Sequence, residues 1–68
     1  MKPSALAVLT LLRARRASGV SVREAEDELG VYRLAARVSE LRDAGYPIRT
    51  KNERNRVGRG THARYILE

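Results

Sequence analysis

The spacing of apolar residues changes at Gly45, and this change limits the folds open to the chain. Before Gly45, apolar residues recur at helical intervals, as in the i, i+3, i+4, i+7 stripe of Ala5, Val8, Leu9 and Leu12. After Gly45, apolar and polar residues alternate, as they do in a strand with one buried face. The sequence therefore predicts an α+β domain with its helices first and a small sheet last.

Length and composition favour one small domain without an active site. The chain has 68 residues, which we assign to a single domain (1–68), and it contains no Phe, Trp or Cys. We expect a core of Leu, Val, Ala and Tyr, and no disulfide or thiolate metal site. One histidine and eight carboxylates are little material for catalysis, so we predict no enzyme, no cofactor and no metal. The apolar run at 5–12 is shorter than the roughly 20 residues of a membrane span, and we expect a location in the bacterial cytoplasm or nucleoid.

A first helix is expected over residues 4–17, with Ser4 as its N-cap and Gly19 beyond its C-terminus. Leu6 and Leu11 lie outside the buried stripe, so this helix has more apolar surface than a monomer requires. Its last turn is basic, and these side chains either stabilise the negative end of the helix dipole or contact phosphate. The residues concerned are Arg13, Arg15 and Arg16.

Two further helices are expected in close succession after a short bridge at 19–22. Ser21 and Glu24 form a capping box, which starts a second helix that Gly30 ends. A third helix is expected over 32–44, and its buried stripe is spaced by three, four and three residues: Val31, Leu34, Val38 and Leu41.

Two strands are expected at 46–51 and 63–67, joined by a polar loop at 52–62 that contains Gly58 and Gly60. Together they form a hairpin, and the predicted element order is α-β-α-α-β-β. The residues expected to point inward are Ile48, Tyr65 and Leu67.

Positive charge is concentrated at the two ends of the chain. The formal net charge is +6, from 14 basic and 8 acidic residues. Residues 1–20 carry four basic side chains and no acid, residues 21–45 have a net charge of −2, and residues 46–68 have a net charge of +4. A domain polarised in this way can turn one face to a polyanion. The alternative is an arginine-rich surface that is simply solvated.

Two helices joined by a short turn that contains glycine form a helix-turn-helix unit, and a C-terminal hairpin makes it a winged one. The second helix of such a unit enters the major groove of DNA, which is about 12 Å wide. Arginine can contact guanine through two hydrogen bonds, alanine permits close approach, tyrosine can reach phosphate, and glutamate can accept from cytosine or orient an arginine. The candidate groove residues are Tyr32, Arg33, Ala36, Arg37 and Glu40. The alternative is a solvated face on which Arg37 pairs with Glu40.

The loop at 52–62 is the candidate wing. Arginines on a flexible loop can enter a narrow minor groove or approach phosphates. The candidate wing residues are Arg54, Asn55, Arg56 and Arg59. The alternative is a basic loop that charge alone holds near DNA. We expect His62, beside this loop, to be a surface or packing residue and not a metal ligand.

A resemblance supports this interpretation. The stretch ELGVYRLAARVSELRDAGYPIRT, from Glu28 to Thr50, followed by ARYILE, resembles small winged helix-turn-helix DNA-binding proteins of bacteriophages and prophages. A similar leucine-glycine-apolar-tyrosine-arginine-leucine-alanine-arginine string opens the recognition helix in that family. The resemblance implies DNA binding and assigns it to Tyr32, Arg33 and Arg37. The wing matches no pattern of the family.

The sequence thus predicts a protein that binds double-stranded DNA, with helix 32–44 in the major groove and wing 52–62 near the minor groove or the phosphates. It would act as a small phage transcriptional regulator or as an accessory factor for DNA recombination. A homodimer or a cooperative array is expected, with Leu6 and Leu11 as candidate contacts. The alternative is an interaction module that binds a host transcription or nucleoid protein through the acidic second helix and the exposed leucines. RNA binding ranks third, because the chain lacks the aromatic platform of single-strand readers.

Overall fold

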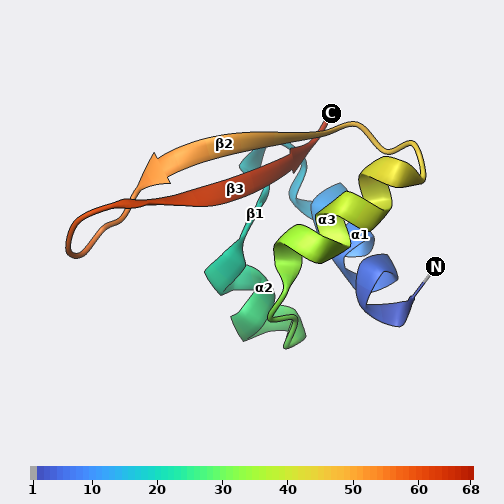
Figure 1. Cartoon of the computed structure of the whole chain (residues 1–68), viewed down its shortest axis with the longest axis horizontal. Helices are drawn as coiled ribbons and strands as arrows, with labels where there is room; N and C mark the ends of the chain where they lie inside the picture. Colours follow the sequence, from blue (N-terminus) through green and yellow to red (C-terminus); the bar gives the residue numbers. More distant parts are fainter. Residues whose placement is uncertain (1) are drawn as a thin grey trace.

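The computed structural model describes residues 2–68, and its elements follow the predicted order α-β-α-α-β-β. Three helices lie together at one end of the molecule, and the β2–β3 hairpin projects beyond them (Figure 1). Within the described residues, no helix combines the length and the apolar character needed to cross a bilayer. The elements are α1 (Pro3–Arg15), a 3₁₀ turn η1 (Arg16–Ser18), β1 (Val20–Ser21), α2 (Val22–Leu29), α3 (Leu34–Asp43), β2 (Ile48–Arg54) and β3 (Thr61–Leu67).

The core forms where α1 and α3 pack against each other. The predicted stripe of α1 is buried, as are the four predicted stripe residues at 31–41. These side chains form one cluster with residues of β1, α2 and the sheet: Val20, Ala25, Ile48 and Tyr65. Each fully buried Leu or Val contributes roughly 1.5–3 kcal/mol, so the loss of any one is a large fraction of the stability of a domain this small.

The ends of α1 differ from the prediction. Ser4 is not the N-cap: that position is Lys2, and the helix begins at Pro3. Proline suits the first helical position because its fixed φ is helical and the N–H it lacks would have no acceptor there. The α-helix ends at Arg15, and residues 16–18 tighten into η1.

The boundaries of α2 confirm the prediction. The hydroxyl of Ser21 accepts from the backbone N–H of Glu24 at 3.2 Å, and the carboxylate of Glu24 accepts from the N–H of Ser21 at 3.1 Å. Gly30 closes the helix with a left-handed φ of 67°. The N–H groups of Gly30 and Val31 then donate to the carbonyl groups of Glu26 and Ala25. These bonds supply donors to carbonyl groups of the last turn, which have no partner within the helix.

The third helix is shorter than predicted, because it begins at Leu34 and ends at Asp43. Tyr32 and Arg33 precede it, and Arg33 occupies the N-cap position with φ −119° and ψ 61°. No Ser, Thr, Asp or Asn lies at residues 31–33 to mark this boundary in the sequence. The predicted helix over 32–44 therefore began two residues too early, whereas its end differs by one residue, with Ala44 as the C-cap.

The sheet has the order β1-β3-β2, with antiparallel pairing throughout, so β3 is its central strand. Strands β2 and β3 stay paired through Asn52–Ala63, Glu53–His62 and Arg54–Thr61. The prediction of an unpaired wing loop over 52–62 was wrong in extent, because only residues 55–60 lie outside the strands.

The inward residues of the hairpin were largely predicted. Ile48 and Tyr65 are buried, whereas Leu67 is half-buried at the edge of the core. Ile66, which was not predicted, is buried because the turn at Gly19 lies against it.

Among the five glycines, Gly19 leaves the least room for a side chain. Its φ is +66°, and a Cβ built there would lie 2.5 Å from the carbonyl oxygen of Tyr65 and 2.8 Å from Cγ1 of Ile66. We expect Gly19→Ala to lower the free energy of unfolding by about 2–4 kcal/mol, because left-handed strain and overpacking add. Urea denaturation measures this loss.

Gly30→Ala is the matched control. Gly30 has nearly the same φ, +67°, but a Cβ there would meet no atom within 4 Å. We expect this variant to lose only about 1 kcal/mol, from backbone strain alone. Equal losses in the two variants would contradict the close approach at Gly19.

Candidate nucleic-acid interface

Most carboxylates of the protein are paired with cationic side chains, and this pairing decides where positive charge remains. Among residues 2–68, six of the eight carboxylates lie within 4.0 Å of a cationic side chain. Two other arginines are held by different contacts: Arg42 by backbone and hydroxyl oxygens of β2, and Arg13 by the ring of Tyr46 at 5.7 Å. Within the described part of the chain, the cations left without such contacts are Arg16, Arg33, Lys51, Arg54, Arg56 and Arg59.

Four of these six cations lie on the hairpin, and a fifth, Arg33, lies at the start of α3. The unpaired positive charge is therefore concentrated on the wing and at the N-terminal end of the third helix. Positive charge with no internal partner is available to phosphate groups.

The N-terminal end of α3 is open to solvent. Tyr32 is 74% exposed, and Arg33 is also exposed. The first N–H groups of a helix have no intrahelical acceptor, and the dipole adds partial positive charge there. This end of α3 therefore combines a guanidinium, a phenol and backbone donors.

Arg37 and Glu40 do not share this exposed surface. The Arg37 side chain is only 20% exposed, and its Nε lies 2.7 Å from Oε1 of Glu40. A terminal nitrogen of Arg37 also donates to the hydroxyl of Ser4 on α1 at 3.4 Å. The expectation of one outward row of residues at 33, 36, 37 and 40 was therefore wrong. The pair of Arg37 with Glu40 in the alternative is present, but it lies half-buried beside α1 and not on a solvated face. The physical reason is that position 37 borders the buried stripe and faces α1.

The exposed side of α3 consists of residues that were not chosen from the sequence, while Ala36 is half-buried. These residues are Ala35, Ser39, Arg42 and Asp43. At 100° per residue, Ser39 and Asp43 lie opposite the buried stripe at 34, 38 and 41, so the stripe could have identified these two residues. Ala35 and Arg42 lie beside the stripe, and their exposure depends on what packs against α3. The small side chains at 35 and 39 leave the helix surface open to close approach.

Arg42 is exposed but structurally engaged. Its guanidinium donates to the carbonyl of Ile48 at 2.8 and 3.0 Å and to the hydroxyl of Thr50 at 2.9 Å. It also lies 5.9 Å from the ring centroid of Tyr65. Arg42 therefore fastens the end of α3 to β2 and fixes the angle between the helix and the hairpin.

The predicted wing residues divide into two groups. Arg54, Arg56 and Arg59 are exposed, and no carboxylate lies within 4.0 Å of any of them among the described residues. Asn55 is half-buried, because its side-chain N–H donates to the carbonyl of Arg59 at 3.0 Å and its backbone N–H donates to the carbonyl of Gly60 at 3.1 Å. Asn55 thus closes the loop through the carbonyl groups of Arg59 and Gly60, while the three arginines stay exposed and two of them, Arg54 and Arg56, border a groove between the hairpin and α2.

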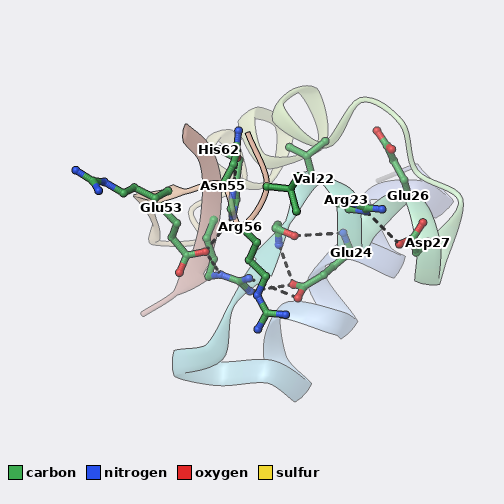
Figure 2. Close-up of a pocket in the computed structure, with 13 residues that line it drawn as sticks. Val22, Arg23, Glu24, Glu26, Asp27, Glu53, Asn55, Arg56 and His62 are labelled. Carbon is green, nitrogen blue, oxygen red and sulfur yellow. Dashed lines mark hydrogen bonds and ion pairs between the residues drawn. The ribbon is translucent and has the colours of Figure 1, made fainter. Parts of the chain in front are cut away.

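Arg64 joins the base of the hairpin to the helices. Its guanidinium donates to the carboxylate of Glu53 on β2 at 2.7 Å, to that of Glu24 on α2 at 2.9 Å and to the carbonyl of Ser18 at 2.9 Å. Both carboxylates border a groove in which residues of α2 face residues of the hairpin, and Figure 2 labels Glu24 and Glu53 there. Arg15 of α1 extends the network by pairing with Glu24 at 3.2 Å and with Glu28.

The network shifts the pKa values of its members. Burial of Glu24 opposes ionisation, but the Ser21 N–H and the guanidinium groups of Arg64 and Arg15 outweigh it and lower the pKa of this carboxyl. The hydrogen bond from Arg64 lowers the pKa of Glu53 against the opposing effect of burial. The same bonds, to Glu53 and Glu24, raise the pKa of Arg64. All three pKa shifts therefore favour the charged forms of Glu24, Glu53 and Arg64, which are the forms that make these ion pairs.

Acid should weaken this network, because a carboxyl with a lowered folded-state pKa stabilises the fold above its unfolded pKa, near 4.3, and loses that effect as pH falls. We expect Arg64→Met to be much less stable than wild type at pH 6, and the difference to narrow by pH 3. Urea denaturation at each pH measures it.

Arg49→Met is the control, because Arg49 and Glu68 form an exposed pair with more than half of each side chain accessible, and such pairs contribute little. A stability difference between Arg64→Met and wild type that is the same at both pH values would contradict the assignment.

The comparisons with known proteins agree with this geometry. The chain matches the model of the winged helix-turn-helix domain over residues 5–68. Neither the curated proteins nor the solved structures give a significant match. The matched segment includes all three helices and the complete hairpin except the first two residues of α1. This chain belongs to the winged helix-turn-helix domain family, whose members typically bind DNA.

Proposed function

We propose that the protein binds double-stranded DNA, with α3 in the major groove and the wing against the neighbouring minor groove or its phosphates. The observation that carries this proposal is the distribution of unpaired cations. Carboxylates pair with most of the arginines that connect elements of the fold, whereas the arginines of the wing and the start of α3 have no carboxylate within 4.0 Å in the part of the chain that the structure describes.

In the proposed complex, the N-terminal end of α3 approaches the base edges, as it does in helix-turn-helix proteins generally. Arg33 can donate two hydrogen bonds to guanine, and the hydroxyl of Tyr32 can reach phosphate. Ala36 and the small residues Ala35 and Ser39 allow the helix to lie deep in the groove. Arg37 and Glu40 act indirectly, because their ion pair and the bond to Ser4 hold α3 against α1.

The hairpin extends beyond the helices (Figure 1), so the wing can reach DNA outside the groove that α3 occupies. Arg54, Arg56, Arg59 and Lys51 supply the charge for contacts with phosphate or the minor groove. Asn55 shapes the loop that carries them.

The rival function, docking of a host protein on the acidic second helix, has weaker support. Glu24 and Glu28 pair with Arg15, and Asp27 lies 4.0 Å from Arg23. Much of the acidic charge of α2 is therefore neutralised internally, which leaves less of it for a partner.

The biological role that we propose is that of a small regulator of transcription or an accessory factor for recombination, of the kind that bacteriophages encode. A single module of this type buries only about 600–1,000 Å² on DNA, so we propose that it acts as a homodimer or a cooperative array. Leu6, which is 48% exposed on α1, is the candidate contact, whereas Leu11 packs against the core. Sedimentation with and without duplex DNA distinguishes a homodimer from a cooperative array on DNA. A bending assay distinguishes an accessory factor for recombination from a regulator of transcription.

We expect Arg33→Ala to weaken specific DNA binding about 5- to 150-fold, which corresponds to the roughly 1–3 kcal/mol of a bidentate base contact. Preference among sequences should relax at the same time, because the lost contact reads a base. Fluorescence anisotropy with specific and random duplexes measures both effects.

Arg23→Ala is the matched control, because it removes the same charge from an exposed side chain on α2. It should bind nearly as wild type does. The recognition assignment fails if Arg33→Ala binds as tightly as wild type, or if Arg23→Ala loses as much affinity.

Each of Arg54→Ala, Arg56→Ala and Arg59→Ala should weaken binding to all sequences alike. Each should also reduce the slope of log affinity against log salt by about 1, from a wild-type value of about −4 to −5 that corresponds to roughly four to six phosphate contacts. Titrations at several salt concentrations test this. Arg49→Ala, which breaks an ion pair on the same hairpin, should leave the slope unchanged, and a slope unaffected by all three wing variants would remove the wing from the interface.

A further inference from the structure

His62 is held between two residues of the wing. It lies on β3 opposite Glu53 of β2, at the base of the wing loop. Its Nδ1 is 2.8 Å from Oδ1 of Asn55, and its Nε2 is 3.1 Å from Oε1 of Glu53. The ring therefore connects the first residue of the loop to the strand that leads into it.

Both of these partners are hydrogen-bond acceptors. An ionised carboxylate can only accept. The amide of Asn55 turns its oxygen to the ring because its N–H group donates to the carbonyl of Arg59. If the amide were turned over, its oxygen would face that carbonyl oxygen instead, and the bond that closes the loop would be lost.

A neutral imidazole has one N–H and can donate to only one of the two acceptors, whereas the imidazolium has two N–H groups and can donate to both. We propose that His62 is a proton-dependent positioning residue of the wing, which in its imidazolium form clips Asn55 to Glu53 and holds the loop in the shape that binds DNA. This inference rests on the proposed function.

The charged surroundings of His62 are nearly balanced. Arg64, its neighbour on the same face of β3, shares the Glu53 oxygen with the ring and opposes a second positive charge. The groove that His62 lines is bordered by four arginines and four carboxylates from α2, the strands and the loop: Arg23, Arg54, Arg56, Arg64, Glu24, Glu26, Asp27 and Glu53. Lys51 lies opposite Arg64 on β2. The two acceptors that contact the ring are therefore the groups that distinguish the neutral imidazole from the imidazolium at this position.

Glu53 remains a constant partner where histidine changes its charge, between about pH 5 and 8, because Arg64 lowers the pKa of its carboxyl. At the low end of this pH range the ring therefore donates to both Asn55 and Glu53, and as pH rises one of these two hydrogen bonds is lost. Linkage makes the effect reciprocal, so DNA phosphates near the wing should in turn favour the imidazolium.

The first test uses NMR of the free protein. The chain has one histidine, so the ring ¹⁵N signals are unambiguous and separate the imidazolium from the two neutral tautomers. We expect the backbone amide signals of residues 55–60 to change together with the ring signals as the pH is varied. In His62→Gln, which keeps one donor but does not titrate, those amide signals should not change with pH. Amide signals of residues 55–60 that stay constant while the ring signals change with pH would overturn the proposal.

The second test measures affinity for a random-sequence duplex at pH 6 and pH 8, at one ionic strength. We expect wild type to bind about 5-fold more weakly at pH 8, as the loss of one hydrogen bond of about 1 kcal/mol implies. His62→Gln should bind with nearly equal affinity at both pH values, near the wild-type level at pH 8. Asn55→Ala should also lose the pH ratio, and it should bind more weakly than His62→Gln because it loses the bond to the Arg59 carbonyl as well. A wild-type pH ratio that His62→Gln retains would contradict the clip.

Arg33→Ala separates this inference from the proposed function. It should weaken binding at both pH values and keep the wild-type pH ratio, because it leaves the clip intact. If wild type binds duplex at neither pH, the proposed function fails, and the role of His62 in DNA binding fails with it, while the NMR result still decides whether the imidazolium orders the loop.

Discussion

The three-way contact of Arg64 is the interaction on which the arrangement of helices and wing depends. One guanidinium reaches the carboxylate that caps α2, a carboxylate of β2 and the carbonyl of Ser18 after α1. A core with few large side chains leaves a long hairpin weakly held, because most of β2 is exposed and few of its side chains enter the core. Arg64 and Arg42 supply the missing attachment, one from the sheet to α2 and the other from α3 to β2. Together Arg64 and Arg42 fix the position of the wing relative to α3. A winged domain needs this fixed geometry so that the wing and α3 can contact the same duplex.

The arginines of this protein therefore serve two purposes that their number alone does not reveal. Arg15, Arg37 and Arg64 are partly buried, are paired with carboxylates and connect elements of the fold. Those of the wing and Arg33 are exposed and have no carboxylate within 4.0 Å among the described residues. The acidic residues thus lower the net charge mainly away from the proposed interface. The remaining positive charge is concentrated on the wing and at the start of α3. A polyanion would therefore meet the arginines that make no ion pair within the fold.

The sequence was informative about the fold where local rules decide the structure. The buried stripes, the capping box at Ser21 and Glu24 and the order of the elements were all predicted, since each depends on residues close in the chain. Boundaries that no capping or turn residue marks were missed. No capping residue at 31–33 indicates that α3 starts at Leu34. The polar residues of the hairpin likewise do not indicate that β2 and β3 stay paired as far as Arg54 and Thr61. Within the site, the exposure of Arg33 was predicted, but the direction of Arg37 depends on how α3 lies against α1. The use of Asn55 and His62 inside the wing likewise depends on strand register, which composition does not reveal.

The central claim is that one side of the molecule, formed by the start of α3 and the wing, receives duplex DNA. The most direct measurement is an NMR titration of the ¹⁵N-labelled protein with a short duplex, followed through the backbone amide signals. We expect the largest shifts at residues 32–39 and 54–60, and little change on the exposed surface of α2 at residues 23–28. Shifts concentrated on α2, with residues 32–39 and 54–60 unaffected, would contradict the central claim.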